Sequence, residues 1–199
     1  MRLEEILRGR PLLGWLTELA LVSAGVFLAL LADQWRESRE HRQLAADALR
    51  NFAEEMRVNR KAVADVRAYH ERLARDIDAF LASDVPKTMQ GFQVATQFRG
   101  VQPVVFEHTA WDLALATQAL SYLPQDIAYA ISRVYTQQQT FQTYENNFAQ
   151  GMFSPSTFQN DDTRALARAM LVYVTDVNIQ EPKLVQSYDE ALPRIMVAP

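Results

Sequence analysis

The sequence predicts an all-α protein in which one N-terminal transmembrane helix continues into a long amphipathic helix packed in a soluble helical bundle. Three observations support this class. An apolar run follows the N-terminus, the stretch from Asp33 to Ser83 lacks proline and glycine and has heptad spacing, and helical spacing returns after Thr109. We divide the 199 residues into a short tail (1–10), a transmembrane helix (11–35), a long amphipathic or coiled-coil helix (36–83), a loop or short hairpin (84–108) and the remainder of the bundle (109–199).

Two tryptophans bound the apolar run. Trp15 and Trp35 are 20 residues apart, which on a helix is about 30 Å, the thickness of the hydrocarbon core of a bilayer. Tryptophan is enriched where membrane meets water, so both are expected to be interface anchors. Glu18 and Asp33, each near an end, are the only charges between them. The run ends without a small-x-small cleavage site, which favours an uncleaved anchor over a signal peptide. The alternative is a buried core helix of a soluble protein.

Small residues gather on one side of this helix. Steps of three and four residues place them on a single packing face, made of Gly14, Glu18, Val22, Gly25 and Ala29. Small residues allow a second transmembrane helix to approach closely. An ionisable side chain is costly against lipid, so Glu18 is expected either to face a partner helix or to extend toward the headgroups.

The same segment resembles the N-terminus of a family of uncharacterised bacterial single-pass membrane proteins, known as a domain of unknown function. The resemblance covers about residues 14–60 and rests on Glu18, the run LALVSAGVFLALLA, Asp33-Gln34-Trp35 and Arg36-Glu37. The sequence departs from the family in having Asp33-Gln34 where the family has a pair of asparagines before the tryptophan. The resemblance implies topology and helical content but no activity. With a short tail that carries three arginines, we expect an inner-membrane protein with a cytoplasmic N-terminus and a periplasmic main domain.

After the anchor, apolar residues follow a seam of alternating three- and four-residue steps. Asn59 and His70 complete this spacing, and we expect them to set register or partner choice. Ten acidic and ten basic residues between 33 and 82 fill the other positions, as is typical of a solvated face. The apolar seam residues are Ala45, Leu49, Phe52, Met56, Val63, Val66, Leu73, Ile77 and Phe80.

The remainder of the bundle is predicted to be helical, with helix starts, ends and one kink or restart at defined positions. These are a capping box variant at Thr109 and Asp112, a helix start at Pro124, an end near Gln150, a cap at Asp161 or Asp162, and a kink or restart at Pro182.

One part of the bundle is depleted of charge and rich in aromatic residues. Between Ile127 and Asn160 the only charged residues are Arg133 and Glu145. This composition resembles the centre of a protein interface. It makes a candidate protein-contact surface of Tyr135, Phe141, Tyr144 and Phe148. The alternative is a central helix that is buried on several sides.

Composition excludes several function classes. The chain has a net charge of −4 without a basic stripe, which argues against nucleic-acid binding, and it contains no cysteine. Its three histidines are isolated, adjacent acids such as Glu54-Glu55 point in different directions on a helix, and no catalytic or nucleotide motif occurs. We therefore expect no catalytic, cofactor-binding or metal site.

The remaining features favour a non-enzymatic role. We expect an accessory or scaffold subunit of a membrane complex, whose partners are the membrane and other integral membrane subunits or a second copy of the chain. The alternatives are a self-assembling coiled-coil membrane protein of the sensor type and a ligand-binding helical domain.

Overall fold

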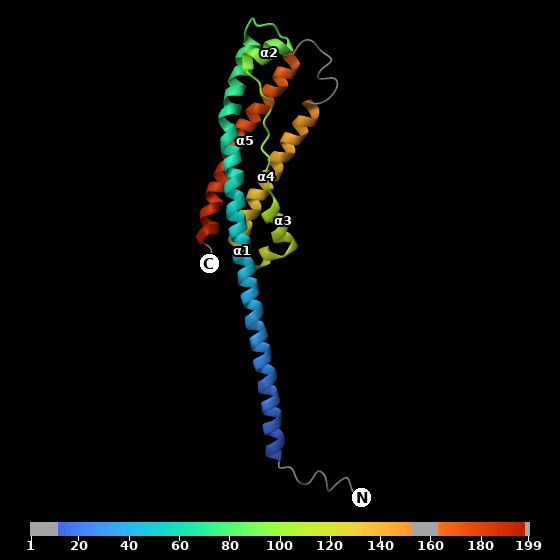
Figure 1. Ribbon diagram of the computed structural model, residues 1–199, viewed down its shortest axis with the longest axis vertical. Coiled ribbons are helices and arrows are strands. Elements are labelled where there is room, and N and C mark those ends of the chain that lie inside the picture. Colours follow the sequence, from blue (N-terminus) through green and yellow to red (C-terminus); the bar gives the residue numbers. More distant parts are fainter. Residues whose placement is uncertain (1–11, 153–162, 198–199) are drawn as a thin grey trace. The chain divides into compact units, whose positions relative to one another are not determined.

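The computed structural model describes residues 12–152 and 163–197 and is all-helical over these ranges, which confirms the predicted fold class (Figure 1). No strand occurs among these residues. The predicted tail at 1–10, the contributions of Phe153 and Phe158 to the aromatic region and the cap at Asp161 or Asp162 lie outside them. The elements are α1 (Leu12–Ala82), α2 (Met89–Thr96), α3 (Thr109–Ala116), the 3₁₀ helix η1 (Ala119–Tyr122), α4 (Gln125–Met152) and α5 (Arg164–Val197).

The chain divides into two compact units, Met1–Leu44 and Ala45–Pro199, and α1 contributes to both. In the first unit every residue from Gly14 to Glu40 is exposed. Among the described residues, α1 is the one helix that is long and apolar enough to cross a membrane. Its most apolar stretch has a mean hydropathy of 1.9. The first unit ends at Leu44, nine residues beyond Trp35, where the transmembrane helix is predicted to end.

In the second unit the seam of α1 faces the interior. Phe52, Met56, Val63, Leu73 and Ile77 are fully buried, and so are the two polar seam residues, Asn59 and His70. Their contacts are to other parts of the same chain. The seam is therefore covered within one protomer, which differs from the coiled-coil pairing that heptad spacing suggested.

α4 and α5 lie side by side and run in opposite directions (Figure 1). α5 continues through Pro182 as one helix, so of the predicted kink or restart the restart is wrong. Proline removes one backbone hydrogen bond from a helix interior. The residues on both sides of Pro182 hold the helix in place because Val177, Glu181 and Leu184 are fully buried.

The segment 84–108 contains helix α2 and no strand among its residues, so the predicted hairpin is wrong. Thr88 caps α2 by accepting a hydrogen bond from the Gly91 N–H at 3.1 Å. Phe92 then packs edge-on against Phe80 of α1 and against Phe98, with ring centroids 5.5 and 5.7 Å apart. These aromatic contacts fasten the short helix over the C-terminal end of α1.

After α2 the chain has no regular secondary structure between residues 98 and 108, and we call this segment the strap. In Figure 1 it follows the length of the bundle from α2 to α3. Val104 and Phe106 are buried on its inner side. A buried stretch without helix or sheet leaves backbone groups that must find other hydrogen-bond partners, and these partners define the site described next.

Candidate functional site

The predicted packing face of the anchor is uncovered by any described part of the chain. Gly14, Glu18, Val22, Gly25 and Ala29 are all exposed. Side-chain atoms added at the two glycines would meet nothing within 4 Å among the described residues. This face is therefore open for contact with lipid or with another helix.

The two predicted interface anchors are also exposed. Trp15 is 57% exposed and Trp35 is 61% exposed. Arg39 lies over the Trp35 ring, with its guanidinium carbon 4.8 Å from the ring centroid. A tryptophan flanked by arginine is the composition expected at a membrane–water boundary.

The aromatic contact surface predicted on α4 divides into two parts. Tyr135 and Phe141 are buried, at 5% and 4% exposure, and belong to the core. For these two residues the expectation of a free surface is wrong, because their rings fill the space between α4 and its neighbours. Tyr144 and Phe148 are half-buried, and both stack on Tyr173 of α5, with ring centroids 5.8 and 3.9 Å apart.

Buried polar side chains of α1 hold the strap. Asn59 pairs with Glu107 through both amide atoms: its Nδ2 donates to the Glu107 carbonyl and its Oδ1 accepts from the Glu107 N–H, each at 2.9 Å. Farther along, the Tyr69 hydroxyl donates to the Gly100 carbonyl at 2.6 Å and accepts from the Arg99 N–H at 3.1 Å. Polar groups in the seam and next to it therefore replace the hydrogen bonds that a strand neighbour would supply.

His70 connects the strap to α5. Its Nε2 lies 2.8 Å from the Val101 carbonyl oxygen, and its Nδ1 lies 2.7 Å from Glu181 Oε1. The His70 and Glu181 side chains are 0% and 1% exposed. Burial disfavours the charged imidazole and lowers the pKa of His70. The hydrogen bond to Glu181 and the negative charge of Glu181 outweigh burial, so the pKa of His70 is raised overall.

Glu145 of α4 is the second buried carboxylate in this region. Its Oε1 accepts hydrogen bonds from the Val104 N–H at 3.2 Å and from the Tyr173 hydroxyl at 3.4 Å. Burial raises the pKa of Glu145 to about 7, although the Val104 hydrogen bond and the charge of His70 act in the opposite direction. Glu145 Oε2 and Glu181 Oε2 receive no hydrogen bond from the described residues.

A third buried carboxylate, Glu55, lies at the other end of the strap. Glu55 accepts hydrogen bonds from the Ala110 N–H at 2.7 Å and from the Tyr135 hydroxyl at 2.5 Å. It therefore supplies an anionic cap for the N-terminus of α3. The predicted capping box at Thr109 and Asp112 is wrong, because α3 begins at Thr109 without a side-chain cap of its own. Glu55 is buried, whereas its neighbour Glu54 is exposed.

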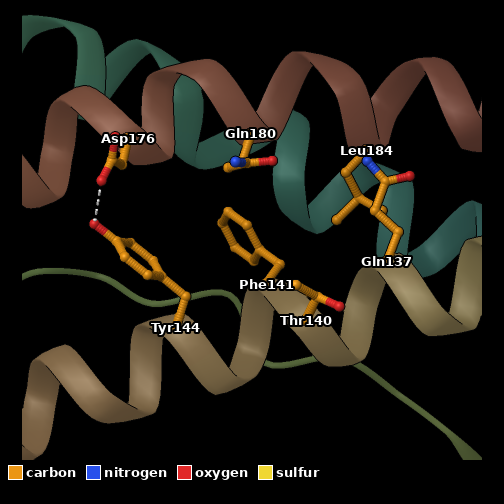
Figure 2. Close-up of a pocket in the computed structure, with 7 residues that line it drawn as sticks. All are labelled: Gln137, Thr140, Phe141, Tyr144, Asp176, Gln180 and Leu184. Atoms are coloured by element: carbon orange, nitrogen blue, oxygen red, sulfur yellow. Dashed lines mark hydrogen bonds between the residues drawn. The ribbon is translucent and has the colours of Figure 1, made fainter.

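A groove between α4 and α5 has a volume of about 220 Å³ (Figure 2). The Tyr144 hydroxyl donates to Asp176 Oδ2 at 2.8 Å at one end, and the Phe141 ring lies on its inner wall. Thr140 and Gln180 are exposed at its rim. No lysine or arginine lines it; the other lining residues are Gln137 and Leu184. Its lining is aromatic and polar with one acidic group.

The sequence contained part of the signal for the buried polar side chains that surround the strap. Asn59 and His70 occupy the seam, and Gln138 and Glu145 follow the spacing of buried apolar residues on α4. Glu181 continues the spacing of Met170, Val174 and Val177 on α5 and was missed because it precedes a proline. Tyr69 and Glu55 were missed because each is the neighbour of a seam position and gives no periodic signal.

The described residues contain no group of three or more histidine, cysteine or acidic side chains arranged to hold a metal ion. The buried cluster can bind backbone groups and protons, and the groove can accept a neutral or cationic side chain. No family model, curated protein or solved structure matches the chain, so the resemblance of residues 14–60 stays a prediction.

Proposed function

We propose that this chain is a non-enzymatic, single-pass membrane protein that acts as an accessory or scaffold subunit of a larger membrane complex. The observation that carries the proposal is the uncovered apolar surface of the first unit. Leu19, Leu21, Phe27, Leu28 and Leu30 are each between 62% and 74% exposed. A continuous apolar surface of this kind is not stable in water and marks a membrane or protein contact.

The second unit offers a place for a partner subunit. The groove between α4 and α5 joins an aromatic wall to uncharged polar rim residues and the Asp176 carboxylate (Figure 2). Aromatic residues with few charges are typical of interface centres. In this proposal a side chain of a partner protein enters the groove, while the anchor face contacts a partner helix within the bilayer.

The self-assembling alternative has less support. It depended on a seam that is free to pair with a second copy, and all the seam residues of α1 except the half-buried Val66 are buried within the second unit. Association of two copies through the anchor face would remain available to such a protein. We propose the inner membrane with the main domain in the periplasm as its location, on the ground that Arg2, Arg8 and Arg10 precede the anchor.

The test is native purification of the full chain with a C-terminal tag in mild detergent, followed by mass determination of the eluted species. We expect stoichiometric co-elution of other membrane proteins. Elution as a single chain, or as copies of this chain alone, would overturn the accessory role. Resistance of the protein to alkaline carbonate extraction separately tests the anchor.

Variants locate the contacts. Gly25→Leu fills the anchor face, and Ala20→Leu is its matched control because residue 20 lies on the opposite side of the helix. Thr140→Trp fills the groove, and Gln139→Trp is its control, since Gln139 is exposed and does not line the groove. We expect Gly25→Leu or Thr140→Trp to release the partner and both controls to retain it. Retention in all four variants would contradict both docking surfaces.

A further inference from the structure

The hydrogen bonds of His70 fix how many protons it shares with Glu181. The Val101 carbonyl oxygen can only accept, so the His70 Nε2 must carry a hydrogen and donate it at 2.8 Å. The opposite ring nitrogen, Nδ1, lies 2.7 Å from Glu181 Oε1. A hydrogen bond at that distance needs a second proton, located either on Nδ1 or on the carboxyl group.

Without the second proton the contact between His70 Nδ1 and Glu181 Oε1 becomes repulsive. The lone pair of Nδ1 would then face a carboxylate oxygen at 2.7 Å in a fully buried position, where electrostatic interactions are strong. The ring would have to turn or withdraw, and the Nε2 bond to Val101 depends on the same ring. The strap bond at Val101 and the proton between Nδ1 and Glu181 are therefore coupled.

The surrounding groups strengthen this dependence. His70 is the only basic side chain that bonds Glu181 or Glu145 among the described residues. From α4 the Glu145 carboxyl faces the same centre, and from α5 the Tyr173 hydroxyl contacts Glu145. The Asn178 amide of α5 bonds the His70 carbonyl at 3.4 Å. On α1 and the strap, the guanidinium groups of Arg72 and Arg99 lie over the Tyr69 ring, with no bond to either carboxylate.

We propose that His70 and Glu181 form a buried proton-binding site that latches the strap to α1 and α5, and that loss of the shared proton releases residues 99–104 from the bundle. The raised pKa of His70 gives the direction of the response. A raised folded pKa means that the latch is fully formed below the ordinary pKa of histidine, and that it opens as pH rises through the folded value.

The experiment is hydrogen–deuterium exchange on the full chain in detergent at a series of pH values from about pH 6 to about pH 10, with labelling times scaled to the intrinsic exchange rate. We expect protection of the Arg99 and Val104 amides to fall at least about tenfold across this range. Amides of α4 and α5 away from the cluster, such as those of Ile131 and Val174, should keep their protection.

Glu181→Gln separates the latch from ordinary alkaline unfolding. The glutamine amide can donate to Nδ1 of neutral His70, so the pair no longer needs the extra proton. We expect this variant to keep the strap protected at the high pH where the unmodified chain loses it. Glu190→Gln, an exposed position on the same helix, is the matched control and should behave like the unmodified chain.

Two results would overturn the proposal. One is an unmodified chain whose strap protection does not change with pH, and the other is a Glu181→Gln variant that loses protection at the same pH as the unmodified chain. Should that variant fail to fold, ¹⁵N chemical shifts of His70 in the unmodified chain decide the question. The latch requires that the imidazole give up its shared proton in the same pH interval in which the strap opens.

Discussion

At the scale of single residues, the core of the second unit differs from a simple apolar bundle. Asn59, His70, Gln138, Glu145 and Glu181 are each at most 3% exposed. Polar groups in such positions are costly unless they are hydrogen-bonded. Four of them bond to the strap or to each other, whereas both amide atoms of Gln138 lack a partner among the described residues. The strap explains the burial of Asn59, His70 and Glu145, whose side chains satisfy its backbone groups.

Glu145 makes stability depend on pH. Its pKa is raised from 4.5 to about 7 by burial, so the folded state binds more protons than the unfolded state between these values, and stability falls as pH rises through this interval. We expect Glu145→Gln to remove this loss, since the glutamine oxygen can still accept from the Val104 N–H. Relative to the unmodified chain, the free energy of unfolding of Glu145→Gln should be higher by up to about 3 kcal/mol at about pH 8 and nearly equal at about pH 4.

Thermal unfolding of the full chain in detergent, followed by circular dichroism, measures this difference. The melting temperature of Glu145→Gln should exceed that of the unmodified chain at the higher pH only. An equal shift at both pH values would show that ionisation of Glu145 is not the cause.

At the scale of elements, the strap takes the place that a fourth long helix would occupy in a regular bundle. It docks by side-chain-to-backbone hydrogen bonds at Asn59, Tyr69, His70 and Glu145. The short helices on its two sides are held by contacts of another kind. α2 is fixed by aromatic packing and close backbone approach, and α3 by the Glu55 carboxylate at its N-terminus.

Asn59→Leu tests the role of side-chain amides in holding the strap. Leucine has a similar size but leaves the Glu107 N–H and carbonyl without their partner, so we expect a loss of about 1–3 kcal/mol in the free energy of unfolding. Asn51→Leu is the control because Asn51 is exposed on the same helix, and its effect should stay within about 0.5 kcal/mol. Equal effects of the two substitutions in denaturant titrations would argue that the amide bonds do not stabilise the strap.

Gly91→Ala tests the close approach of α2 to the preceding loop. A Cβ at residue 91 would lie 2.1 Å from the Pro86 carbonyl oxygen, so the backbone would have to shift. We expect Gly91→Ala to lower the free energy of unfolding by about 1–3 kcal/mol. Gly151→Ala provides the comparison. Gly151 is also helical, and a Cβ added there would meet no described residue within 4 Å, so we expect this substitution to leave the free energy of unfolding unchanged or to raise it by up to about 1 kcal/mol. If Gly91→Ala proved as stable as Gly151→Ala by thermal melting, the close contact would be refuted.

At the scale of the whole molecule, the two units have different surfaces. The first exposes a continuous apolar surface, and the second buries its own aliphatic and aromatic core. We therefore expect the fragment 45–199 to fold without the first unit and to remain in solution without detergent. Its circular dichroism should show a helical spectrum and a cooperative melting transition. Aggregation or a non-cooperative melt of the fragment would indicate that the second unit needs the apolar segment to fold.

The helical periods of the sequence were sufficient to predict the all-α class, the apolar span and the buried face of α1 between Leu49 and Phe80. Periodicity reports which residues turn inward and is therefore reliable over long helices. It could not predict α2 or the course of the strap, since short segments held by a glycine contact and by side-chain amides carry no period. For the same reason it proposed a capping box at Thr109 and Asp112, where the structure has no side-chain cap.

The sequence by itself determined that this chain has an apolar helix long enough to span a membrane, a long amphipathic continuation and an aromatic helix with few charges, because each of these is a local pattern of side chains. Only the tertiary structure decided what those faces meet. Whether the seam pairs with a second copy or folds back, and whether His70 faces solvent, a metal or Glu181, depends on contacts between residues 31 to 111 positions apart in the sequence. Such contacts leave no trace in local spacing, and they bring Asn59, His70 and Glu145 to the backbone of the strap and Glu55 to the N-terminus of α3.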